Sequence, residues 1–399
     1  MERRITFRRA QEIMLPFAAP VGTEVVPLES ALGRVCAADQ VARENYPAYD
    51  RSPFDGYAVI AEDTVGASRA RPVTLKVIEE VPAGTVPTVT VTPGHAVKLM
   101  TGAPIPIGAN AVTKFETTEF TSDRVTLFEE FGDNRNVIPA GEDVRIGAIL
   151  APRGSALTAP MLGTLAAQGI VSVEVYHHPR VGIISTGSEV TPIDSPAILG
   201  KLRDSNRYTL HGYLTQMGCE PVVLGLCGDD TDAVAALVLK GVDAGLAAIV
   251  STGGASVGDY DFTAAAFERV NAELLAIAGA FRPGGALVFA RCKNALLFGL
   301  SGNPASAVTT LLAVCAPAIR KLRGLEELAH RIVSVKLAEA QRTRGVTRLV
   351  RGTLDPSTGV FTPHAQGNGM LTSWVGCDVI AVLPDADLDA GATVDALLL

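Results

Sequence analysis

Apolar positions change their spacing along the chain in a way that divides it into regions. From Gly56 to Ala151, short β-rich runs are separated by Pro, Gly and Asp-Asn turns, a pattern that predicts an all-β or barrel-like fold. From about residue 178, apolar strands alternate with helical segments, which predicts a parallel sheet covered by helices. After Glu327 short strands return without helical spacing, so we expect a small C-terminal β domain.

The predicted elements of the central region follow one another as strand and helix. We expect strands at 180–185, 221–226, 247–251, 286–290 and 295–300, and helices at 205–217, 231–239, 262–274 and 304–322. Two further helices, at 6–16 and 27–35, are expected before the β-rich region.

Composition narrows the class of protein. A chain of 399 residues with 48% hydrophobic and 19% charged residues is typical of a folded protein with two or more domains. The net charge of −8 and one short basic cluster argue against a nucleic-acid partner. Apolar runs are shorter than a membrane span and no secretory signal is visible, so we expect a cytoplasmic protein without membrane segments. Six scattered cysteines show no zinc-site spacing.

The segment Gly254-Ala255-Ser256-Val257-Gly258 matches the G-x-S-x-G motif of serine hydrolases. In a nucleophile elbow the strand runs directly into the serine, whereas here the strand ends near Ser251 and two glycines intervene. The histidines His330 and His364 lie in the separate β-rich tail. We therefore favour a glycine-rich cradle, because glycines let backbone N–H groups face an anion at a helix N-terminus.

Three more loops are expected at the same edge of the sheet, where ligands of open parallel sheets bind. Together the four loops supply the candidate ligand-binding residues, which are Thr186, Gly187, Ser188, Asp229, Asp230, Gly253, Gly254, Ser256, Gly258, Asp259, Ser301, Gly302, Asn303 and Pro304. Acids among them would repel a bare phosphate unless Mg²⁺ bridges the two groups or the acids accept hydrogen bonds from a heterocycle. Asp230 has an alternative role as a helix N-cap.

Seven stretches of the chain resemble, in order, the motifs of one known family. They are DRSPFDGYAV (50–59), KLMTGAPIP (98–106), AGEDVRIG (140–147), ISTGSEV (184–190), DSNRYTL (204–210), STGGASVGDYDFT (251–263) and GLSGNPASA (299–307). The set is similar to that of the molybdopterin molybdenumtransferases, which comprise the MoeA proteins and the gephyrin E domain, and it spans nearly the whole chain.

The resemblance implies an enzyme that inserts molybdate into adenylated molybdopterin and releases AMP in a Mg²⁺-dependent reaction. It implies a homodimer, with the molybdopterin adenylyltransferase and acceptor molybdoenzymes as further partners. It also implies a multidomain α/β plus β fold: a linking domain (1–26, 45–53 and 144–177), a β-rich inserted domain (27–44 and 54–143), a central parallel α/β molybdopterin-binding domain (178–327) and a C-terminal β-barrel-like domain (328–399).

The resemblance also assigns roles to residues. The catalytic set would be Asp55, Thr101, Asp143, Glu189, Asp261, Arg282 and Arg351, and the Mg²⁺ ligands would come from Glu189, Asp229, Asp230 and Asp261. Arg282 and Arg351 would hold molybdate. The family often has lysines in a K-x-x-x-K-P-G-K pattern, but here Ala278 and Gly285 occupy two of the lysine positions and Arg282 a third, while Asn368 replaces a frequent serine.

Those departures leave other hypotheses open. The chain could bind molybdopterin or a partner protein without catalysing transfer, or it could use tungstate or another oxyanion. A generic nucleotide-binding enzyme is a further alternative, although no G-x-G-x-x-G motif is present.

Overall fold

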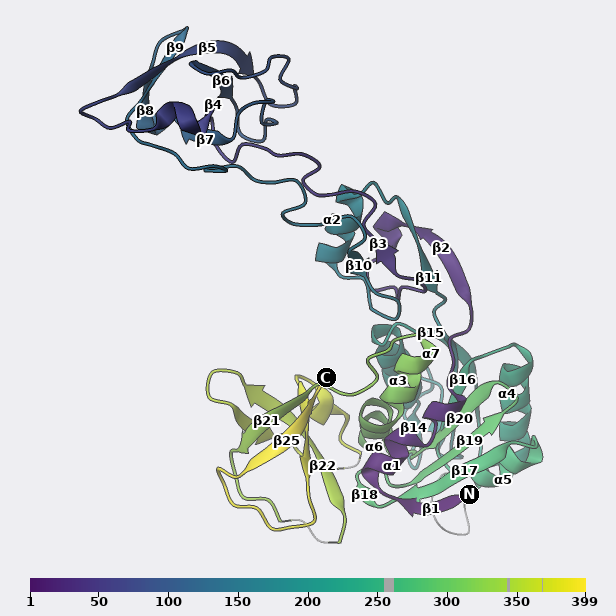
Figure 1. Ribbon diagram of the computed structural model, residues 1–399. Coiled ribbons are helices and arrows are strands. Elements are labelled where there is room, and N and C mark those ends of the chain that lie inside the picture. The colour runs from purple at the N-terminus through teal and green to yellow at the C-terminus, as the bar shows by residue number, and fades with distance from the viewer. Residues whose placement is uncertain (255–261, 343–344, 368) are drawn as a thin grey trace. The chain divides into compact units, whose positions relative to one another are not determined.

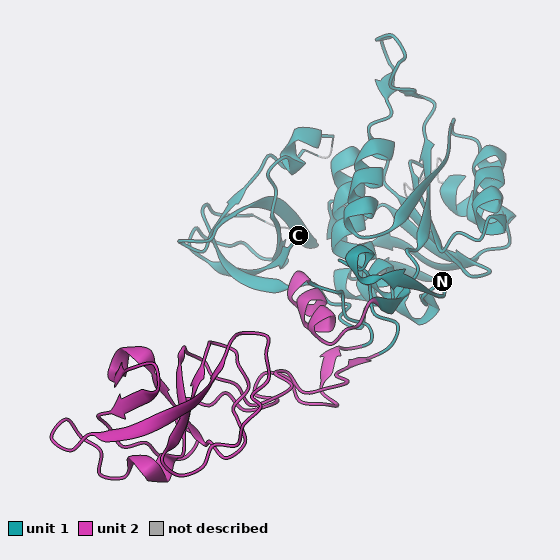
Figure 2. Ribbon diagram, turned by 90° about the horizontal axis from the view of Figure 1, so that it is seen from above, with its two compact units in different colours: residues 1–38, 153–158, 172–399 teal, residues 39–152, 159–171 magenta. Residues whose placement is uncertain are grey.

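The computed structural model describes residues 1–254, 262–342, 345–367 and 369–399 (Figure 1). The chain forms two compact units (Figure 2). Unit 1 contains Met1–Ala38, Arg153–Thr158 and Ser172–Leu399, and unit 2 contains Asp39–Pro152 and Ala159–Val171. Four predicted site residues, Ser256, Gly258, Asp259 and Asp261, lie outside the described residues. The finer division into four domains stays a prediction.

Unit 1 is built on a mixed sheet of seven strands, as far as the structure describes it. In spatial order they are β1 (Glu2–Ile5), β17 (Glu273–Gly279), β19 (Leu287–Cys292), β20 (Ala295–Leu300), β16 (Ala248–Thr252), β12 (Arg180–Thr186) and β15 (Glu220–Cys227). The last four run parallel, as predicted. Because β19 is antiparallel to both β20 and β17, β17 runs in the same direction as those four strands.

Helices cover both faces of this sheet (Figure 1). One face packs against α1 (Phe7–Glu12), α3 (Asn206–Gln216), α6 (Pro304–Thr310) and α7 (Ala316–Leu322). The other packs against α4 (Thr231–Asp243) and α5 (Phe262–Arg269). Each face of the sheet has its own hydrophobic core, and alternate residues of a strand pack into one or the other: Ile183 belongs to the first core and Ile184 to the second. The predicted helix-covered sheet is therefore confirmed, but the strand expected at 286–290 in a parallel sheet is β19, which is antiparallel to both of its neighbours.

Two predicted helices are wrong in whole or in part. Pro27 ends strand β2 (Thr23–Pro27), and only a 3-10 turn (Leu28–Ser30) follows it instead of a helix to residue 35. The helix expected over 262–274 ends at Arg269, and Asn271 has φ of +54°, a frequent helix-ending conformation. Strand β17 begins with residues that favour helices. They form a strand because pairing with β1 and β19 outweighs their local preference.

The predicted helix 304–322 is α6 and α7 joined by a π-helical turn (Leu311–Cys315). Pro317 has no N–H, so the carbonyl of Ala313 loses its usual helical partner. Instead it accepts hydrogen bonds from Gln11 Nε2 at 2.7 Å and His330 Nε2 at 3.1 Å. This is the one described helix long and apolar enough to span a membrane, yet 89% of the qualifying window is buried. Its position in the core accounts for its apolar composition.

The C-terminal part of unit 1 is a small closed β structure. Its strands are β18 (Phe281–Arg282), β21 (Ile332–Leu337), β22 (Thr347–Asp355), β23 (Val360–Pro363), β24 (Val379–Leu383) and β25 (Thr393–Leu398). Pairing between β22 and β24 closes the ring, which gives the barrel-like fold that the sequence predicts. The outer strand β18 comes from the loop after β17 and pairs with β22, so it attaches the barrel to the α/β sheet. A 3-10 turn spans Leu371–Trp374.

Unit 2 is β-rich, as the spacing of its apolar residues indicates. Its main sheet contains β7 (Ala111–Lys114), β4 (Gly56–Val59), β6 (His95–Leu99), β5 (Val73–Val81), β9 (Arg124–Leu127) and β8 (Thr118–Phe120). Helix α2 (Ala159–Ala167) and the pair β3 (Gln40–Val41) and β10 (Ile149–Ala151) complete it. In unit 1, β2 pairs with β11 (Ser172–Tyr176), and β13 (Val190–Thr191) pairs with β14 (Leu202–Arg203). The remaining described 3-10 turns are Leu15–Phe17, Ala61–Thr64 and Phe115–Thr117.

Candidate functional site

The predicted ligand loops of unit 1 leave the sheet at one edge. Strands β12, β15, β16 and β20 are parallel neighbours, so the loops that follow them begin at the same carboxyl ends. The loop after β17 begins at this edge too, because β17 has the same direction. Ligands of open α/β sheets bind at this edge.

Three of these loops are in close contact around Gly253. A side chain at Gly253 would place Cβ 2.3 Å from Thr186 Oγ1 and 2.6 Å from Thr186 O, and φ at Gly253 is +102°. On its other side, a Cβ on Gly302 would lie 3.3 Å from Gly253 Cα. Thr186 is buried and donates from Oγ1 to Thr252 O at 2.9 Å. Glycine at 253 is therefore required for the loops to meet.

The loops after β12 and β15 hold each other through reciprocal hydrogen bonds. Ser188 N–H donates to Asp229 Oδ2 at 3.2 Å, and Asp229 N–H donates to Ser188 Oγ at 3.3 Å. Lys201, which no sequence motif had indicated, donates from Nζ to Ser188 O at 2.7 Å. It places a positive charge beside the loop predicted to bind an anion. Its position could not be read from the sequence because it depends on the pairing of β13 with β14.

Asp230 is the N-cap of α4. Its Oδ1 accepts hydrogen bonds from Asp232 N at 2.8 Å and Ala233 N at 3.0 Å. This confirms the capping alternative for Asp230. Asp229 is exposed, and its Oδ2 accepts one backbone hydrogen bond, from Ser188 N–H.

The two aspartates should respond differently to amidation. We expect Asp230→Asn to keep near-normal activity and stability, because Asn caps helices about as well as Asp. Asp229→Asn should lower turnover at least about 10-fold if its charge acts on the ligand. Steady-state kinetics with thermal melting checks both. The expectation is contradicted if Asp230→Asn is the more damaging change at unchanged stability.

The carboxylates of these loops fit a hard cation only in part. Glu189 and Asp229 are exposed on neighbouring loops and offer oxygen ligands, which Mg²⁺ prefers. Within the described ranges, no three His, Cys, Asp or Glu side chains are grouped closely enough to hold a metal alone. Mg²⁺ commonly binds through one or two carboxylates and substrate phosphates, and two carboxylates meet that lower requirement.

Asn206 is a second residue at this edge that was not among the predicted site residues. It begins α3 and donates from Nδ2 to Gly302 O at 2.9 Å, while its buried Oδ1 has no partner among the described residues. The Ser301 hydroxyl accepts from Asn303 N at 3.2 Å. The motif DSNRYTL could have indicated Asn206, since polar residues at a helix start near a sheet edge often face a ligand.

In unit 2, the structure brings together Asp55 and Thr101. Asp55 Oδ1 accepts from Thr101 N at 2.6 Å and Thr101 Oγ1 at 2.7 Å. These backbone and side-chain hydrogen bonds, assisted by Lys98, lower the pKa of Asp55 below its usual value. Next to it, a Cβ on Gly56 would lie 1.8 Å from Thr113 O, so this position requires glycine. The carboxylate of Asp55 is therefore ionised, and Thr101 fixes its orientation.

Asp143 lies in another part of unit 2. It lines a cavity of about 270 Å³ with Tyr46 and Gln168. Gln168 is 5% exposed, and its Oε1 accepts from Arg43 N and Glu44 N, which fixes the orientation of the amide. Its Nε2 has no partner in the part of the chain that the structure describes. Gln168 could not be identified from the sequence, because only the packing of these segments leaves its Nε2 donor without a described partner.

The two arginines predicted to hold molybdate lie on opposite faces of one sheet. In the parallel pair β18 and β22, Arg282 is in register with Arg348, which is three residues from Arg351. Side chains alternate between faces along a strand, so Arg351 points away from the face of Arg282. Arg351 is fully buried and donates to Ser373 Oγ, Gln366 Oε1, Ala365 O and Gly367 O. Its guanidinium orders the 365–367 segment.

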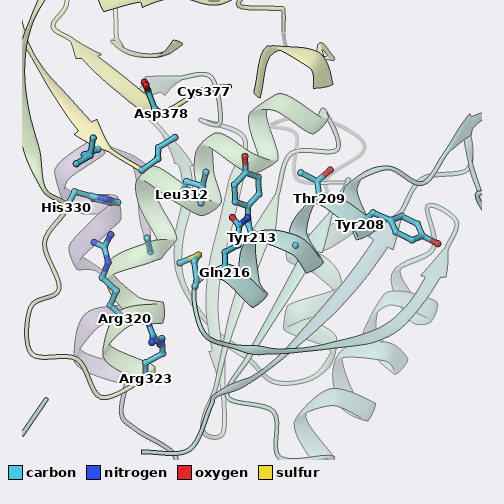
Figure 3. Close-up of a pocket in the computed structure, with 15 residues that line it drawn as sticks. Tyr208, Thr209, Tyr213, Gln216, Leu312, Arg320, Arg323, His330, Cys377 and Asp378 are labelled. Carbon is cyan, nitrogen blue, oxygen red and sulfur yellow. The ribbon is translucent and has the colours of Figure 1, made fainter. Parts of the chain in front are cut away.

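A cavity of about 760 Å³ lies elsewhere in unit 1, between α3, α7 and the C-terminal strands (Figure 3). It contains none of the predicted site residues. Arg320, Arg323 and His330 line one side, and Tyr213 and Gln216 come from α3. Arg320 already donates to the carbonyls of Leu328 and Ala329, so we do not assign the substrate to this cavity.

His330 makes the stability of unit 1 sensitive to acid. Its Nε2 donates to Ala313 O and its buried Nδ1 has no described partner, while burial and nearby Arg320 lower its pKa to about 4. The unfolded chain takes up this proton near pH 6.5, so stability falls between about pH 6.5 and pH 4. We expect a loss of about 1–3 kcal/mol from this group. The test is the free energy of unfolding in urea at pH 7.5 and at pH 4.5, for wild type and for His330→Gln, which keeps a donor for Ala313 O. The variant should lose less stability than wild type between the two pH values. An identical loss in both proteins would contradict His330 as the origin.

Comparisons with known proteins cover almost the whole chain. Family models match residues 5–169 (MoeA N-terminal region, domain I and II), 182–321 (probable molybdopterin binding domain) and 335–399 (MoeA C-terminal region, domain IV). The molybdopterin molybdenumtransferase of Bacillus subtilis is 35% identical over 391 residues, with 94% of this chain and 90% of that protein covered. A Staphylococcus aureus protein of the same name is 32% identical with the same coverage.

Solved structures agree with this result. The molybdopterin biosynthesis moeA protein of Pyrococcus horikoshii is similar with a TM-score of 0.84 and 31% identity over 99% of both chains. The structure of a molybdopterin biosynthesis moeA protein from Pyrococcus horikoshii OT3 gives a TM-score of 0.86 at 29% identity, with 99% of this chain and 100% of that chain covered. Sequence motifs, fold and relatives coincide over the full length, and the chain therefore belongs to the MoeA family of molybdopterin molybdenumtransferases.

Proposed function

We propose that this transferase of molybdenum cofactor biosynthesis takes adenylated molybdopterin and molybdate and releases AMP as the metal enters the pterin dithiolene. The observation that carries the proposal is the cluster of loops around Gly253, where Thr186 and Gly302 meet at the carboxyl edge of the sheet. This is the place where an open α/β sheet binds a nucleotide. Similarity to the curated transferases extends over 94% of the chain.

Each loop has a separate task in this proposal. Lys201 adds a positive charge beside Ser188, where the substrate phosphates are proposed to bind. Asn206, with its unpartnered Oδ1 and its hydrogen bond to Gly302 O, can accept a hydrogen bond from the pterin or the nucleobase. The glycines let the backbone approach the ligand without interference from side chains.

Mg²⁺ would be held by Glu189 and Asp229 together with a substrate phosphate, with Asp261 and Asp230 as the other predicted ligands. When bound, it would neutralise negative charge on the phosphoanhydride and stabilise the departing AMP. The protein's own part is to orient Asp229, whose Oδ2 accepts a hydrogen bond from Ser188 N–H.

The oxyanion is assigned to the loop after β17. Arg282 is exposed there and has no described carboxylate partner, so its guanidinium is free to bind an oxyanion through two N–H groups. Arg351 acts as a positioning residue, because its hydrogen bonds hold the 365–367 segment. These separate tasks replace the paired role that the family resemblance implies for the two arginines.

We also propose that the protein works in the cytoplasm as a homodimer, in which unit 2 of one protomer supplies Asp55, Thr101 and Asp143 to the loops of its partner. These polar residues have no role in the core of unit 2 that would explain them, and the Asp55–Thr101 pair presents a charged oxygen to solvent. The molybdopterin adenylyltransferase would provide the substrate, and acceptor molybdoenzymes would take up the product.

Activation of an apo-molybdoenzyme tests the function. Purified protein, adenylated molybdopterin, Mg²⁺ and molybdate should together activate the acceptor, and omission of any one should prevent it. The second candidate, a protein that only binds molybdopterin, is favoured by the absence of lysine at Ala278 and Gly285. It predicts tight pterin binding without activation. Tungstate in place of molybdate distinguishes the tungstate-using alternative.

A further inference from the structure

A cavity of about 660 Å³ opens on the main sheet of unit 2. The residues that line it include Tyr57, Glu80, Lys98 and Phe120. Lys98 also acts on the carboxylate of Asp55, because its positive charge helps to lower the pKa of that group. The cavity is therefore next to the Asp55–Thr101 pair of the same unit.

The strand register places three of the lining side chains in one row. Tyr57 of β4 pairs with Lys98 of β6, and Lys98 pairs with Glu80 of β5. Paired residues of neighbouring strands point to the same face of a sheet. Lys98 Nζ donates to Glu80 Oε1 at 3.0 Å, yet 55% of the Glu80 side chain and 26% of the Lys98 side chain are exposed. The row thus presents a hydrogen-bond donor beside an acceptor.

The neighbouring acid, Glu79, is not available in the same way. Its carboxylate accepts hydrogen bonds from the hydroxyl and backbone N–H of Thr88 and from the backbone N–H of Val89. These bonds lower the pKa of Glu79. Glu79 therefore holds a loop of unit 2, and Glu80 is the acid that faces a ligand in the cavity.

Aromatic rings form the apolar wall of the cavity. The ring centroids of Tyr57 and Phe115 are 5.1 Å apart, and Phe120 lies 6.0 Å from the first and 5.7 Å from the second. Lys98 Nζ lies 5.5 Å from the centroid of Phe115, which holds the ammonium against this cluster. Phe120 is nevertheless 54% exposed. An exposed ring beside a cavity is a surface on which a flat ligand can stack.

We propose that this cavity binds a flat nitrogen heterocycle of the adenylated substrate, stacked on Phe120 and hydrogen-bonded to Glu80 and Lys98. The inference rests on the proposed function. Adenine has an N–H donor next to a ring-nitrogen acceptor, and the pterin has an N–H donor next to a carbonyl oxygen. Both ends of the substrate therefore match a carboxylate beside an ammonium group. The bound heterocycle would lie close to Asp55, the carboxylate that unit 2 is proposed to contribute.

Calorimetric titration with AMP and with molybdopterin, each in the presence of Mg²⁺, tests the site without turnover. The ligand that occupies the cavity should bind at least about 5-fold more weakly to Phe120→Leu, which keeps an apolar side chain but removes the stacking surface. Glu80→Gln should weaken the same ligand about 10-fold, because a neutral amide replaces the charged acceptor. The affinity for the other ligand should not change, so the two titrations distinguish adenine from pterin.

Glu119→Gln is the matched control for charge. Glu119 is exposed on β8 beside Phe120, but side chains alternate along a strand, and Glu119 is not among the described residues that line the cavity. This variant should bind both ligands as wild type does. Unchanged affinities for both ligands in Phe120→Leu and Glu80→Gln would overturn the heterocycle site. Equal losses in Glu80→Gln and Glu119→Gln would overturn it as well.

Activation of the apo-molybdoenzyme separates this inference from the proposed function. If wild type activates the acceptor and both cavity variants bind AMP and molybdopterin normally, the function stands and the cavity has no part in it. Binding that depends on Phe120 and Glu80, without activation by wild type, would keep the site and refute the transfer. If Phe120→Leu melts at a lower temperature, Phe120→Tyr decides, because it keeps the ring: it should bind as wild type does, and a loss as large as that of Phe120→Leu would refute stacking.

Discussion

Gly253→Ala should abolish binding of adenylated molybdopterin. An alanine there would hold a Cβ 2.3 Å from Thr186 Oγ1 in a backbone conformation with φ of +102°. The three loops would have to separate, and the edge at which the ligand is proposed to bind would lose its shape. A distortion of about 3 kcal/mol or more corresponds to at least about 100-fold weaker binding. Calorimetric titration of the variant measures this directly.

A matched glycine separates the effect on binding from backbone strain. Gly245 has φ of +72°, and no other atom lies within 4 Å of the position that a Cβ would take, so Gly245→Ala introduces strain without a clash. It should lose about 1 kcal/mol of stability and keep wild-type affinity. Wild-type binding by Gly253→Ala, or equal losses in both variants, would show that the contact with Thr186 does not shape the site.

Two inactive variants should restore activity to each other if the active site is shared between protomers. Asp55→Asn disables unit 2, and Gly253→Ala disables the loops of unit 1. A purified heterodimer with one change in each chain would contain one intact site and one doubly altered site. It should therefore show about half of wild-type turnover, although each homodimer is inactive.

The reverse combination is the control. A heterodimer of wild type with a chain carrying both Asp55→Asn and Gly253→Ala should be inactive, because every shared site would contain one altered half. If each site is formed within one chain, the results exchange: the double-mutant heterodimer keeps about half of the activity and the complementing pair has none. AMP release by tag-purified heterodimers is the measurement.

Local patterns were enough to predict that the candidate loops leave the sheet at one edge. Apolar runs ended by Thr186-Gly187, Thr252-Gly253 and Ser301-Gly302 identify strand ends, and parallel strands must bring such ends to one edge. The fold class was confirmed for the same reason. The capping role of Asp230 was one of two alternatives in the sequence, and its hydrogen bonds to the start of α4 confirm that role; which aspartate binds ligand stays a prediction.

The proposed oxyanion site depends on long-range pairing and could not be predicted in this way. Strand β17 has helix-forming residues, so its direction, and with it the position of Arg282, follows from partners in distant segments. The opposite faces of Arg282 and Arg351 follow from the register of β18 with β22. The role of Arg351 was assigned by resemblance alone, and its burial with four internal acceptors was not visible in the sequence.

The decisive measurement is AMP release from adenylated molybdopterin by the purified protein with Mg²⁺, in the presence of molybdate, of tungstate, or of neither. The proposed function predicts AMP release that depends on the oxyanion and matches the amount of metal-loaded cofactor formed, with Arg282 supplying charge where Ala278 and Gly285 provide none. Tight binding of the substrate without AMP release under any of the three conditions would contradict it and identify a protein that only binds the pterin.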